Sequence, residues 1–418
     1  MKTLPLSPTL LAITALQGAG AALLFTSVLV LTYALGPELY GRYAWVVAGG
    51  GILSLVVQYG LPTTIVKSFA PLDLKGAEAL PVAFTVASLW GLSVLVTIGV
   101  TLVDGFVKGL PRAEMIWILP IGLGLAYVSI ADATLRAADQ GLRANIAKQL
   151  IRPGLLVAVA LTLLLYKVVD PSDYLLSYAA AGLVSGIAFL WHLPVSALRN
   201  LDKAAWVRSN PAHFQVALAR SVSNFLPVFI SGLFLPPEQV AYFAIAIQLT
   251  APLQFGLAAT RSFYAAKINA RIKQSDEPGA RRTLRGAAFF SRSIALLAAL
   301  AIPALYVALN SIGIDPLAKF DDTYLLFLVF LATALGQFGY AMFGPVQMVA
   351  ILLDDERRVL LVTVTLTACF AIGLTVMALS GSVLAVAVTM PVYTIALTTS
   401  LRLRVARSFD ARKFGQET

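Results

Sequence analysis

The chain consists of long apolar stretches separated by short polar ones. A transmembrane helix needs about 20 mostly apolar residues, and twelve stretches come close to this length. They are residues 9–34, 44–66, 80–103, 115–135, 150–166, 175–195, 215–234, 240–264, 287–309, 323–350, 359–379 and 382–401. The pattern therefore predicts an all-α, polytopic membrane protein with about 12 transmembrane helices.

The composition supports this interpretation. Hydrophobic residues make up 59% of the 418 positions and charged residues only 12%, whereas soluble domains carry about 25% charged residues. The first apolar stretch, 9–34, is too long for the core of a signal peptide and lacks a convincing cleavage site, so we expect it to be retained as a span. A single cysteine, Cys369, excludes a disulfide framework within the chain.

Basic residues are distributed unevenly between the two sides of the predicted spans. With a cytoplasmic N-terminus, the inner side has 26 Lys and Arg residues and the outer side five. This asymmetry follows the positive-inside rule and predicts a multi-pass protein of the cell membrane with both termini cytoplasmic. It also accounts for the net charge of +10 without a nucleic-acid partner, because basic loops orient spans and contact anionic membrane lipid.

A short motif occurs twice along the chain. LGPELYGRYA at 35–44 and LPPEQVAYFA at 235–244 share four identities at an offset of 200, and each follows an apolar stretch on the predicted outer side. Because six spans separate the two copies, the halves cross the membrane in the same direction. We expect two six-helix bundles related by a pseudo-two-fold axis along the membrane normal, with a cavity between them.

The expected domains follow from this repeat. They are an N-terminal bundle at 1–198, a cytoplasmic linker at 199–214, a C-terminal bundle at 215–404 and a cytoplasmic tail at 405–418.

Three stretches of the chain resemble one transporter family. They read LGPELYGRYAWVVAGGGILSLVVQYGLPTTIVKS at 35–68, ADQGLRANIAKQLIRPGLL at 138–156 and LPPEQVAYFAIAIQLTAPLQFGLAATRSFYAAKI at 235–268. They are similar to the polysaccharide-export flippases, often called O-antigen flippases, of the MATE-like MOP (multidrug/oligosaccharidyl-lipid/polysaccharide) superfamily. The twelve-span layout extends this resemblance over the whole chain.

The resemblance implies a function in the biosynthesis of cell-surface polysaccharide such as lipopolysaccharide O-antigen. Members move a polyprenyl-diphosphate-linked glycan from the cytoplasmic to the outer leaflet by alternating access, and polysaccharide polymerase and assembly proteins are implied as partners. No phosphate-binding loop of the G-x-x-x-x-G-K-[ST] type occurs in the chain, so we expect an ion gradient, the membrane potential or consumption of the product to drive transport.

Polar residues inside the predicted spans are the candidates for substrate binding, since a charge in the bilayer usually faces protein or a watery cavity. Arg220, Asn224 and Pro227 share one face of the seventh span, and Pro227 is a candidate gating residue. Gln254 and Arg261 lie near one face of the eighth span. Both arginines are close enough to the inner boundary to snorkel, so a cavity position and an interfacial one remain alternatives.

Three further groups complete the candidate site. Gln337, Tyr340, Gly344 and Gln347 form a polar stripe on the tenth span that could bind sugar hydroxyls or another helix. Gln17 and Gln58 are candidates from the first and second spans.

Asp132 and Arg136, four residues apart at the inner end of the fourth span, form either a gating ion pair or a self-neutralising helix end. The basic loop at 267–286 could attract a diphosphate head group or simply orient the protein. The glycines at 49–51, together with Gly18, Gly122 and Gly124, are expected to allow close approach of helices.

Other functions are less compatible with the sequence. A MATE-type multidrug or small-solute exporter would have the same architecture, but span 9–34 contains no carboxylate to bind a coupling cation or a cationic drug. A membrane scaffold or a glycan-polymerising enzyme is a third alternative, and the short outer connections with scattered carboxylates disfavour an enzyme. His192 and His213 lack companion ligands, so neither a metal site nor a cofactor is predicted.

Overall fold

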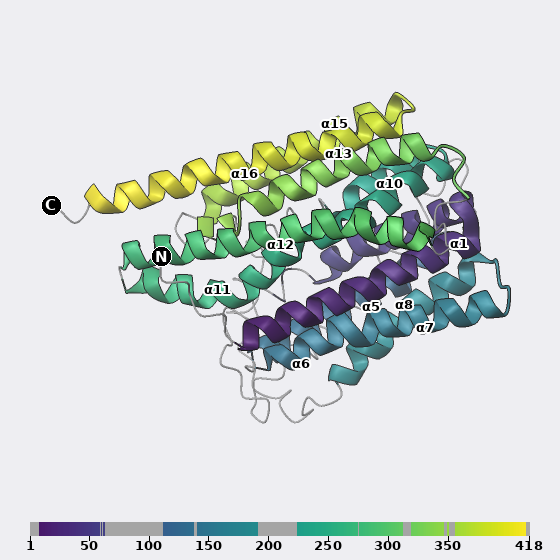
Figure 1. The fold of residues 1–418 in the computed structure, drawn as a ribbon, viewed down its shortest axis with the longest axis horizontal. Helices are drawn as coiled ribbons and strands as arrows, with labels where there is room; N and C mark the ends of the chain where they lie inside the picture. The colour runs from purple at the N-terminus through teal and green to yellow at the C-terminus, as the bar shows by residue number, and fades with distance from the viewer. Residues whose placement is uncertain are drawn as a thin grey trace. The chain divides into compact units, whose positions relative to one another are not determined.

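The computed structural model describes residues 8–58, 60, 62, 112–137, 140–190, 224–274, 276–311, 319–346, 349–350 and 356–414. All regular elements in these ranges are helices (Figure 1). The chain forms two compact units: an N-terminal unit, Ala22–Ala244, and a C-terminal unit, which combines Met1–Ala21 with Ile245–Thr418. The predicted bundle boundaries at 198 and 215 lie outside the described residues and stay a prediction.

The N-terminal unit is built around α5 (Ile118–Ala137) and α8 (Pro171–Leu190), which pack along each other (Figure 1). The helices α6 (Gly141–Ile146) and α7 (Arg152–Leu165) flank the short π-helix η2 (Ala147–Ile151), and α7 also packs on α8. The unit further contains most of α1 (Pro8–Gln58), the single turn α4 (Arg112–Met115), the helix Asn224–Phe234 and the first residues of α10 (Pro237–Thr250).

The C-terminal unit has α16 (Val383–Phe414) at its centre, in contact with both α13 (Thr323–Met342) and α15 (Glu356–Leu379). A second helix pair is formed by α11 (Phe255–Lys273) and α12 (Glu277–Ser311). The short 3₁₀-helix η4 (Ala251–Gln254) contacts α12 and α13. In Figure 1 the long yellow helix α16 has α13 and α15 beside it.

Eight helical segments of the described residues are long and apolar enough to cross a membrane. They are Thr14–Gln58, Ile118–Arg136, Leu142–Leu165, Pro237–Thr260, Glu277–Ala304, Thr323–Met342, Val359–Leu379 and Val383–Arg407. The prediction of an all-α, multi-pass membrane protein is confirmed. The count of twelve spans stays a prediction, because the third span and parts of the second, sixth and seventh lie outside the described residues.

The first two predicted spans form one long helical segment that is broken at Gly36. Gly36 has φ +73°, in the left-handed region that glycine enters at low cost. Pro37 follows as the first residue of the second half, where its missing N–H removes no hydrogen bond of that helix. The Gly-Pro pair in the first copy of the repeat therefore ends one span and starts the next.

Two helices extend beyond the predicted boundaries. The apolar helical segment that contains the fifth predicted span begins at Leu142 rather than at residue 150, and Lys148 in its first half is neutralised by Asp132 of α5. The predicted loop at 267–286 is mostly helical, since α11 continues to Lys273 and α12 begins at Glu277. Asp276 caps α12 by accepting a hydrogen bond from the N–H of Gly279 at 2.9 Å.

Glycines bring helices together in the N-terminal unit, as predicted. A Cβ atom on Gly124 of α5 would lie 3.1 Å from the Cα of Gly182 on α8, and one on Gly50 would lie 2.5 Å from the side chain of Ile121. Gly18 is an exception, because no atom of another element lies within 4 Å of its Cβ position.

Candidate functional site

The two copies of the repeated motif contact each other in the N-terminal unit. A Cβ atom on Gly41 would lie 1.8 Å from the carbonyl oxygen of Pro237, so only glycine fits there. Trp45 Nε1 donates a hydrogen bond of 3.0 Å to the carbonyl of Phe229, and the two rings stack with centroids 5.5 Å apart. The contact puts both turns at the same end of their helices, as the repeat predicts.

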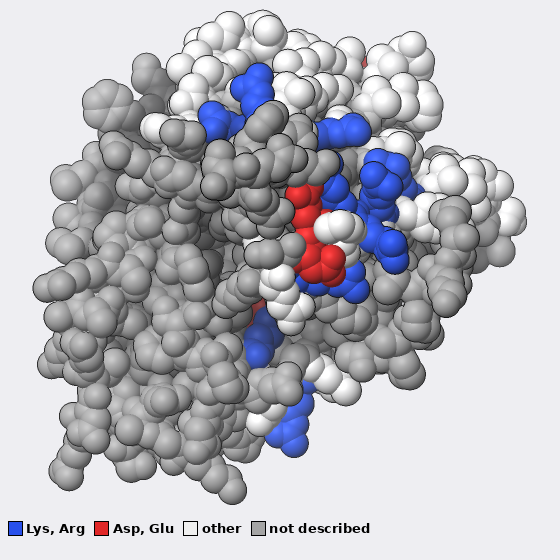
Figure 2. Space-filling model, turned by 90° about the vertical axis from the view of Figure 1, so that its left-hand side faces the viewer, with Lys and Arg blue, Asp and Glu red and all other residues white. Residues whose placement is uncertain are grey.

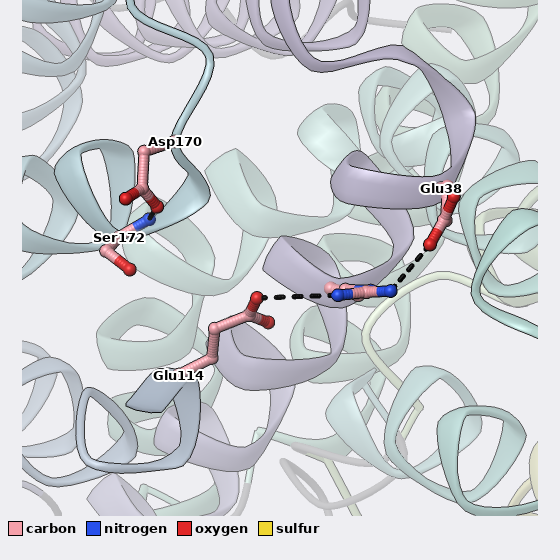
Figure 3. Close-up of polar contacts among 5 residues, drawn as sticks. Glu38, Glu114, Asp170 and Ser172 are labelled. Atoms are coloured by element: carbon pink, nitrogen blue, oxygen red, sulfur yellow. Dashed lines mark hydrogen bonds and ion pairs between the residues drawn. The ribbon is translucent and has the colours of Figure 1, made fainter. Parts of the chain in front are cut away.

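A group of charged side chains lies beside the first of these turns (Figure 3). Arg42 forms an ion pair with Glu38, one helical turn before it, at 2.5 Å. It also lies 3.9 Å from Glu114 of α4. Asp170 accepts a hydrogen bond of 2.8 Å from the N–H of Ser172 at the start of α8. This outer cluster, named for the side on which the sequence predicts it, consists of residues from α1, from α4 and from the start of α8.

Glu114 is the buried member of the outer cluster. Its side chain is 8% exposed, and its Oε2 atom has no hydrogen-bond partner among the described residues. Burial raises the pKa of the Glu114 carboxyl, Arg42 opposes this shift, and the nearby negative charge of Asp170 adds to it. The carboxyl can therefore take up a proton more readily than an exposed glutamate.

The predicted pair Asp132 and Arg136 is present in α5 and includes a third residue. Arg136 Nε lies 3.0 Å from Asp132 Oδ1, and Lys148 Nζ of η2 lies 3.5 Å from Asp132 Oδ2. The side chain of Asp132 is only 12% exposed. The carboxylate thus connects two helices, which is more than a self-neutralising helix end would require.

The structure brings together two predicted residues of the C-terminal unit, Gln254 and Gln337. The side-chain amide of Gln254 donates a hydrogen bond to the side-chain oxygen of Gln337 on α13. Gln254 is the last residue of η4, which interrupts the eighth span directly after Thr250. The pair still has one amide oxygen and one NH₂ group for a ligand.

The other predicted residues are not brought together by the described contacts. Arg220 and Gln347 lie outside the described residues, as do His192 and His213, and the side chain of Arg261 is not described. Asn224 is exposed at the start of the helix Asn224–Phe234, whereas Pro227, Gln58 and Gln17 are buried. Gln17 Oε1 has no hydrogen-bond partner within the described part of the chain.

The tenth span is interrupted inside the predicted polar stripe. The helix α13 ends at Met342, and Gly344 has φ +68°. A Cβ atom on Gly344 would lie 2.8 Å from the Cβ of Ala288 on α12. The predicted stripe therefore does not continue from Gln337 to Gly344 along one helix face, and Gln347 lies outside the described residues.

Sequence reasoning missed several polar residues of the N-terminal unit. The predicted fifth span, 150–166, contains Arg152 and begins two residues after Lys148, but neither cation was selected for the site, and Glu114 counted only among the scattered outer carboxylates. The stretch from Leu142 to Leu165 remains strongly apolar despite its cations, so a longer hydropathy window would have included Lys148 as well. Nothing in the local sequence indicates the burial of Glu114.

Basic side chains gather where α11 ends and α12 begins in the C-terminal unit. Figure 2 shows Lys and Arg side chains around a smaller group of carboxylates on this face. Arg281 pairs with Glu277 at 2.7 Å and Arg271 with Asp276 at 3.8 Å, while Arg282 and Arg285 are exposed. The basic character predicted for residues 267–286 is therefore displayed on two helix ends.

An apolar groove of about 720 Å³ lies between α15 and α16. Its lining includes Cys369, Phe370, Met377 and Val392, and Cys369 is exposed in it. The groove offers almost no polar group, so sugar or phosphate would not bind there.

Solved structures similar to this one include transporters of the MOP superfamily and a lipid II flippase. An inward-facing multidrug-resistance MATE transporter of the MOP superfamily has a TM-score of 0.62 at 16% identity, covering 93% of this chain and 95% of the other. The lipid II flippase MurJ, in an inward closed conformation, has a TM-score of 0.59 at 12% identity, covering 96% of this chain and 89% of the other. A MOP-superfamily transporter from Pyrococcus furiosus is described as having a binding pocket of reverse polarity. It has a TM-score of 0.54 at 13% identity, covering 97% of this chain and 96% of the other.

At the level of sequence, neither a protein-family model nor a curated protein matches the chain. The structural similarity nevertheless extends over almost the whole chain. A helical, multi-pass arrangement of this extent, with both copies of its repeated turn in contact, identifies the chain as having the fold of the MOP-superfamily transporters, as expected from its sequence.

Proposed function

We propose that the protein is a flippase that moves a lipid-linked oligosaccharide from the cytoplasmic to the outer leaflet of the cell membrane. The observation that supports this most is the combination of the MOP fold with cationic and amide side chains inside its spans, while residues 9–34 contain no carboxylate. An anionic diphosphate linked to a sugar requires both kinds of group. Transport, rather than catalysis, would then be the activity in cell-surface polysaccharide biosynthesis.

The proposed binding groups have distinct roles. Arg220 and Arg261 would donate to the diphosphate, since a guanidinium forms bidentate hydrogen bonds with phosphate oxygens. Gln254 and Gln337 would bind sugar hydroxyls through the amide groups that their mutual hydrogen bond leaves unused. Asn224, Gln17, Gln58 and Gln347 are further candidates for contacts with the glycan.

Alternating access requires helices that can change shape inside the membrane. Pro227 lacks an N–H donor, and its own carbonyl is held by Ser231 Oγ at 2.6 Å. The ion pairs of Asp132 with Arg136 and Lys148 would stabilise one arrangement of α5 and η2 and break in the other. Polysaccharide polymerase and assembly proteins would take the product from the outer leaflet.

A MATE-type exporter of drugs or small solutes is the second candidate, because MATE transporters have the same fold. The two functions differ in the charge of the substrate. Uptake of a cationic drug that depends on a proton or sodium gradient, with no glycan export, would favour the exporter.

The test is export of glycan to the outer leaflet in cells that depend on this protein, normalised to its abundance in the membrane. Arg220→Ala is expected to lose export and Arg220→Lys to keep part of it, because lysine retains the charge but not the planar fork. The matched control is Arg292→Ala. Arg292 is an exposed arginine of α12 whose Nε donates to the carbonyl of Met342 at 2.7 Å, and we expect its loss to leave export unchanged.

Full export by Arg220→Ala would remove Arg220 from the site, as would equal activity of the alanine and lysine variants. Absence of glycan export by the unaltered protein would contradict the proposed function itself.

A further inference from the structure

Arg152 is a cation within the apolar helical segment Leu142–Leu165 of the N-terminal unit. It lies ten residues after Leu142 and 13 before Leu165, which corresponds to about 15 and 20 Å along the helix axis. The segment qualifies as a candidate membrane span by its length and apolar composition.

The guanidinium of Arg152 is turned toward other helices of the N-terminal unit. It donates a hydrogen bond to the hydroxyl of Tyr178 on α8 and lies 4.9 Å from the centroid of the same ring. Tyr178 in turn meets Tyr43 of α1 edge to face, with centroids 6.3 Å apart. Tyr178 thus holds the guanidinium inside the unit, and Tyr43 packs against Tyr178.

Arg152 has no carboxylate partner among the described residues. Tyr178 is its hydrogen-bond acceptor, and its Nε atom is buried without one. The neighbouring cations differ, since Lys148 and Arg136 share the carboxylate of Asp132. None of the described carboxylates therefore neutralises the positive charge of Arg152, and a charge at the bilayer centre costs about 2.5–3.5 kcal/mol on insertion scales.

The helix is also irregular at this position. The π-helix η2 ends at Ile151, and Pro153 lacks the N–H that a regular α-helix would direct to the carbonyl of Gln149. Such wide turns are frequent at functional sites. Here the irregular turn places Arg152 directly at the point where the helix changes from π to α geometry.

From this geometry we infer that Arg152 is an anion-binding residue for the phosphoryl oxygens of a phosphate or diphosphate group that enters the membrane. Its free guanidinium donors suit such oxygens, and cation–π contact with Tyr178 orients the planar fork while leaving its charge available. The identity of the ligand as a lipid-linked diphosphate rests on the proposed function. The anion site itself rests on Arg152, Tyr178 and the lack of a carboxylate partner for Arg152 within the described part of the chain.

The experiment measures binding to the purified full-length protein in detergent by isothermal titration. Farnesyl diphosphate is the probe, and farnesol and inorganic pyrophosphate separate the contributions of the prenyl chain and of the free anion. We expect Arg152→Ala to raise the Kd for farnesyl diphosphate at least about 30-fold, with farnesol unaffected. Arg143→Ala is the matched control, because Arg143 is exposed near the start of the same helical segment and donates a hydrogen bond to the side chain of Gln140.

Two conservative variants separate anion binding from a structural role. Arg152→Lys keeps the charge and is expected to weaken binding about tenfold. Tyr178→Phe removes the hydrogen bond but keeps the ring, and is expected to change the Kd less than about fivefold. If Arg152 only held α7 to α8, Tyr178→Phe and Arg152→Ala would weaken binding equally.

The inference is overturned if the unaltered protein fails to bind farnesyl diphosphate or if Arg152→Ala binds it normally. Binding of inorganic pyrophosphate as tightly as farnesyl diphosphate would assign the site to a free anion. The proposed function is tested separately by glycan export, so diphosphate binding that depends on Arg152 in a protein without glycan export would contradict the flippase and leave the anion site standing.

Discussion

Two spans of this protein are interrupted beside a proline, and the interruptions have opposite chemistry. In the N-terminal unit, η2 precedes Pro153 and places Arg152 among tyrosines without a carboxylate. In the C-terminal unit, η4 contains Pro252 and ends at Gln254, whose amide is already bound to Gln337. Each proline removes a backbone donor, but only the first interruption has a charge that the described chain leaves unneutralised.

The difference indicates separate roles for the two interruptions. A neutral amide pair satisfies itself and can exchange partners with sugar hydroxyls at little cost. An unneutralised cation inside a membrane is costly, and an anionic ligand offsets that cost only while it is bound. We therefore expect anion capture to depend on η2 and glycan contacts or bending to depend on η4.

The largest expected effect comes from making the first interruption resemble the second. Arg152→Gln replaces the cation by a neutral amide and should reduce the initial rate of glycan-lipid transport in proteoliposomes about 100-fold or more, because a charged partner of the phosphate is lost. Gln254→Leu is the comparison and should reduce the rate much less, because it removes a neutral hydrogen-bonding group rather than a charge. Similar rates for both variants would remove the distinction between the two interruptions.

A smaller effect is expected from the proline of the first interruption. Pro153→Ala restores a backbone N–H and allows η2 to become regular α-helix, which moves Arg152 relative to Tyr178. Transport should fall about tenfold, since a displacement of about 1 Å can cost up to about 100-fold. The rate is measured in proteoliposomes, and an unchanged rate would show that the π turn is dispensable.

The amide pair of the second interruption should affect stability more than transport. Gln254→Leu leaves the buried oxygen of Gln337 without its donor and should lower the free energy of unfolding by about 1–3 kcal/mol. The double variant Gln254→Leu with Gln337→Leu removes both partners and should recover part of this loss. Thermal unfolding of the three variants in detergent gives the coupling, and purely additive losses would argue against the hydrogen bond.

The smallest expected effect concerns Glu114, a buried acidic group in the same unit as the cation Arg152. Its raised pKa means that the folded protein binds the proton more tightly than the unfolded chain. The resulting stabilisation is fully present below the unfolded value of 4.5 and is lost as the pH rises through the folded pKa. Glu114→Gln should flatten the dependence of the unfolding midpoint on pH in this window, and an unchanged profile would show that another group titrates there.

Much of the fold could be predicted from the sequence. Apolar stretches marked the helices, and Gly36 with Pro37 marked the turn between the first two, because both signals act within one helix. The position of the fifth span was predicted less well. Cationic residues are typical of loops, and the side chains that accommodate the cations of this span, Asp132 and Tyr178, lie on other helices.

The candidate site was predicted only in part. Four of its residues were selected because they are polar and lie inside or at the ends of spans. The structure pairs Gln254 with Gln337 and Asp132 with Arg136. Glu114, Lys148 and Arg152 were not selected. Their importance depends on burial and on missing or shared partners, which a hydropathy pattern does not contain.

The sequence by itself determined that the chain is a bundle of membrane helices with a repeated turn. The physical reason is that lipid offers no hydrogen bonds, so each apolar segment must satisfy its backbone as a helix. Only the tertiary structure decided which side chains meet. Trp45 and Phe229 are 184 residues apart and Gln254 and Gln337 are 83 apart, and such pairs form because packing of helices, rather than local preference, sets which faces come into contact.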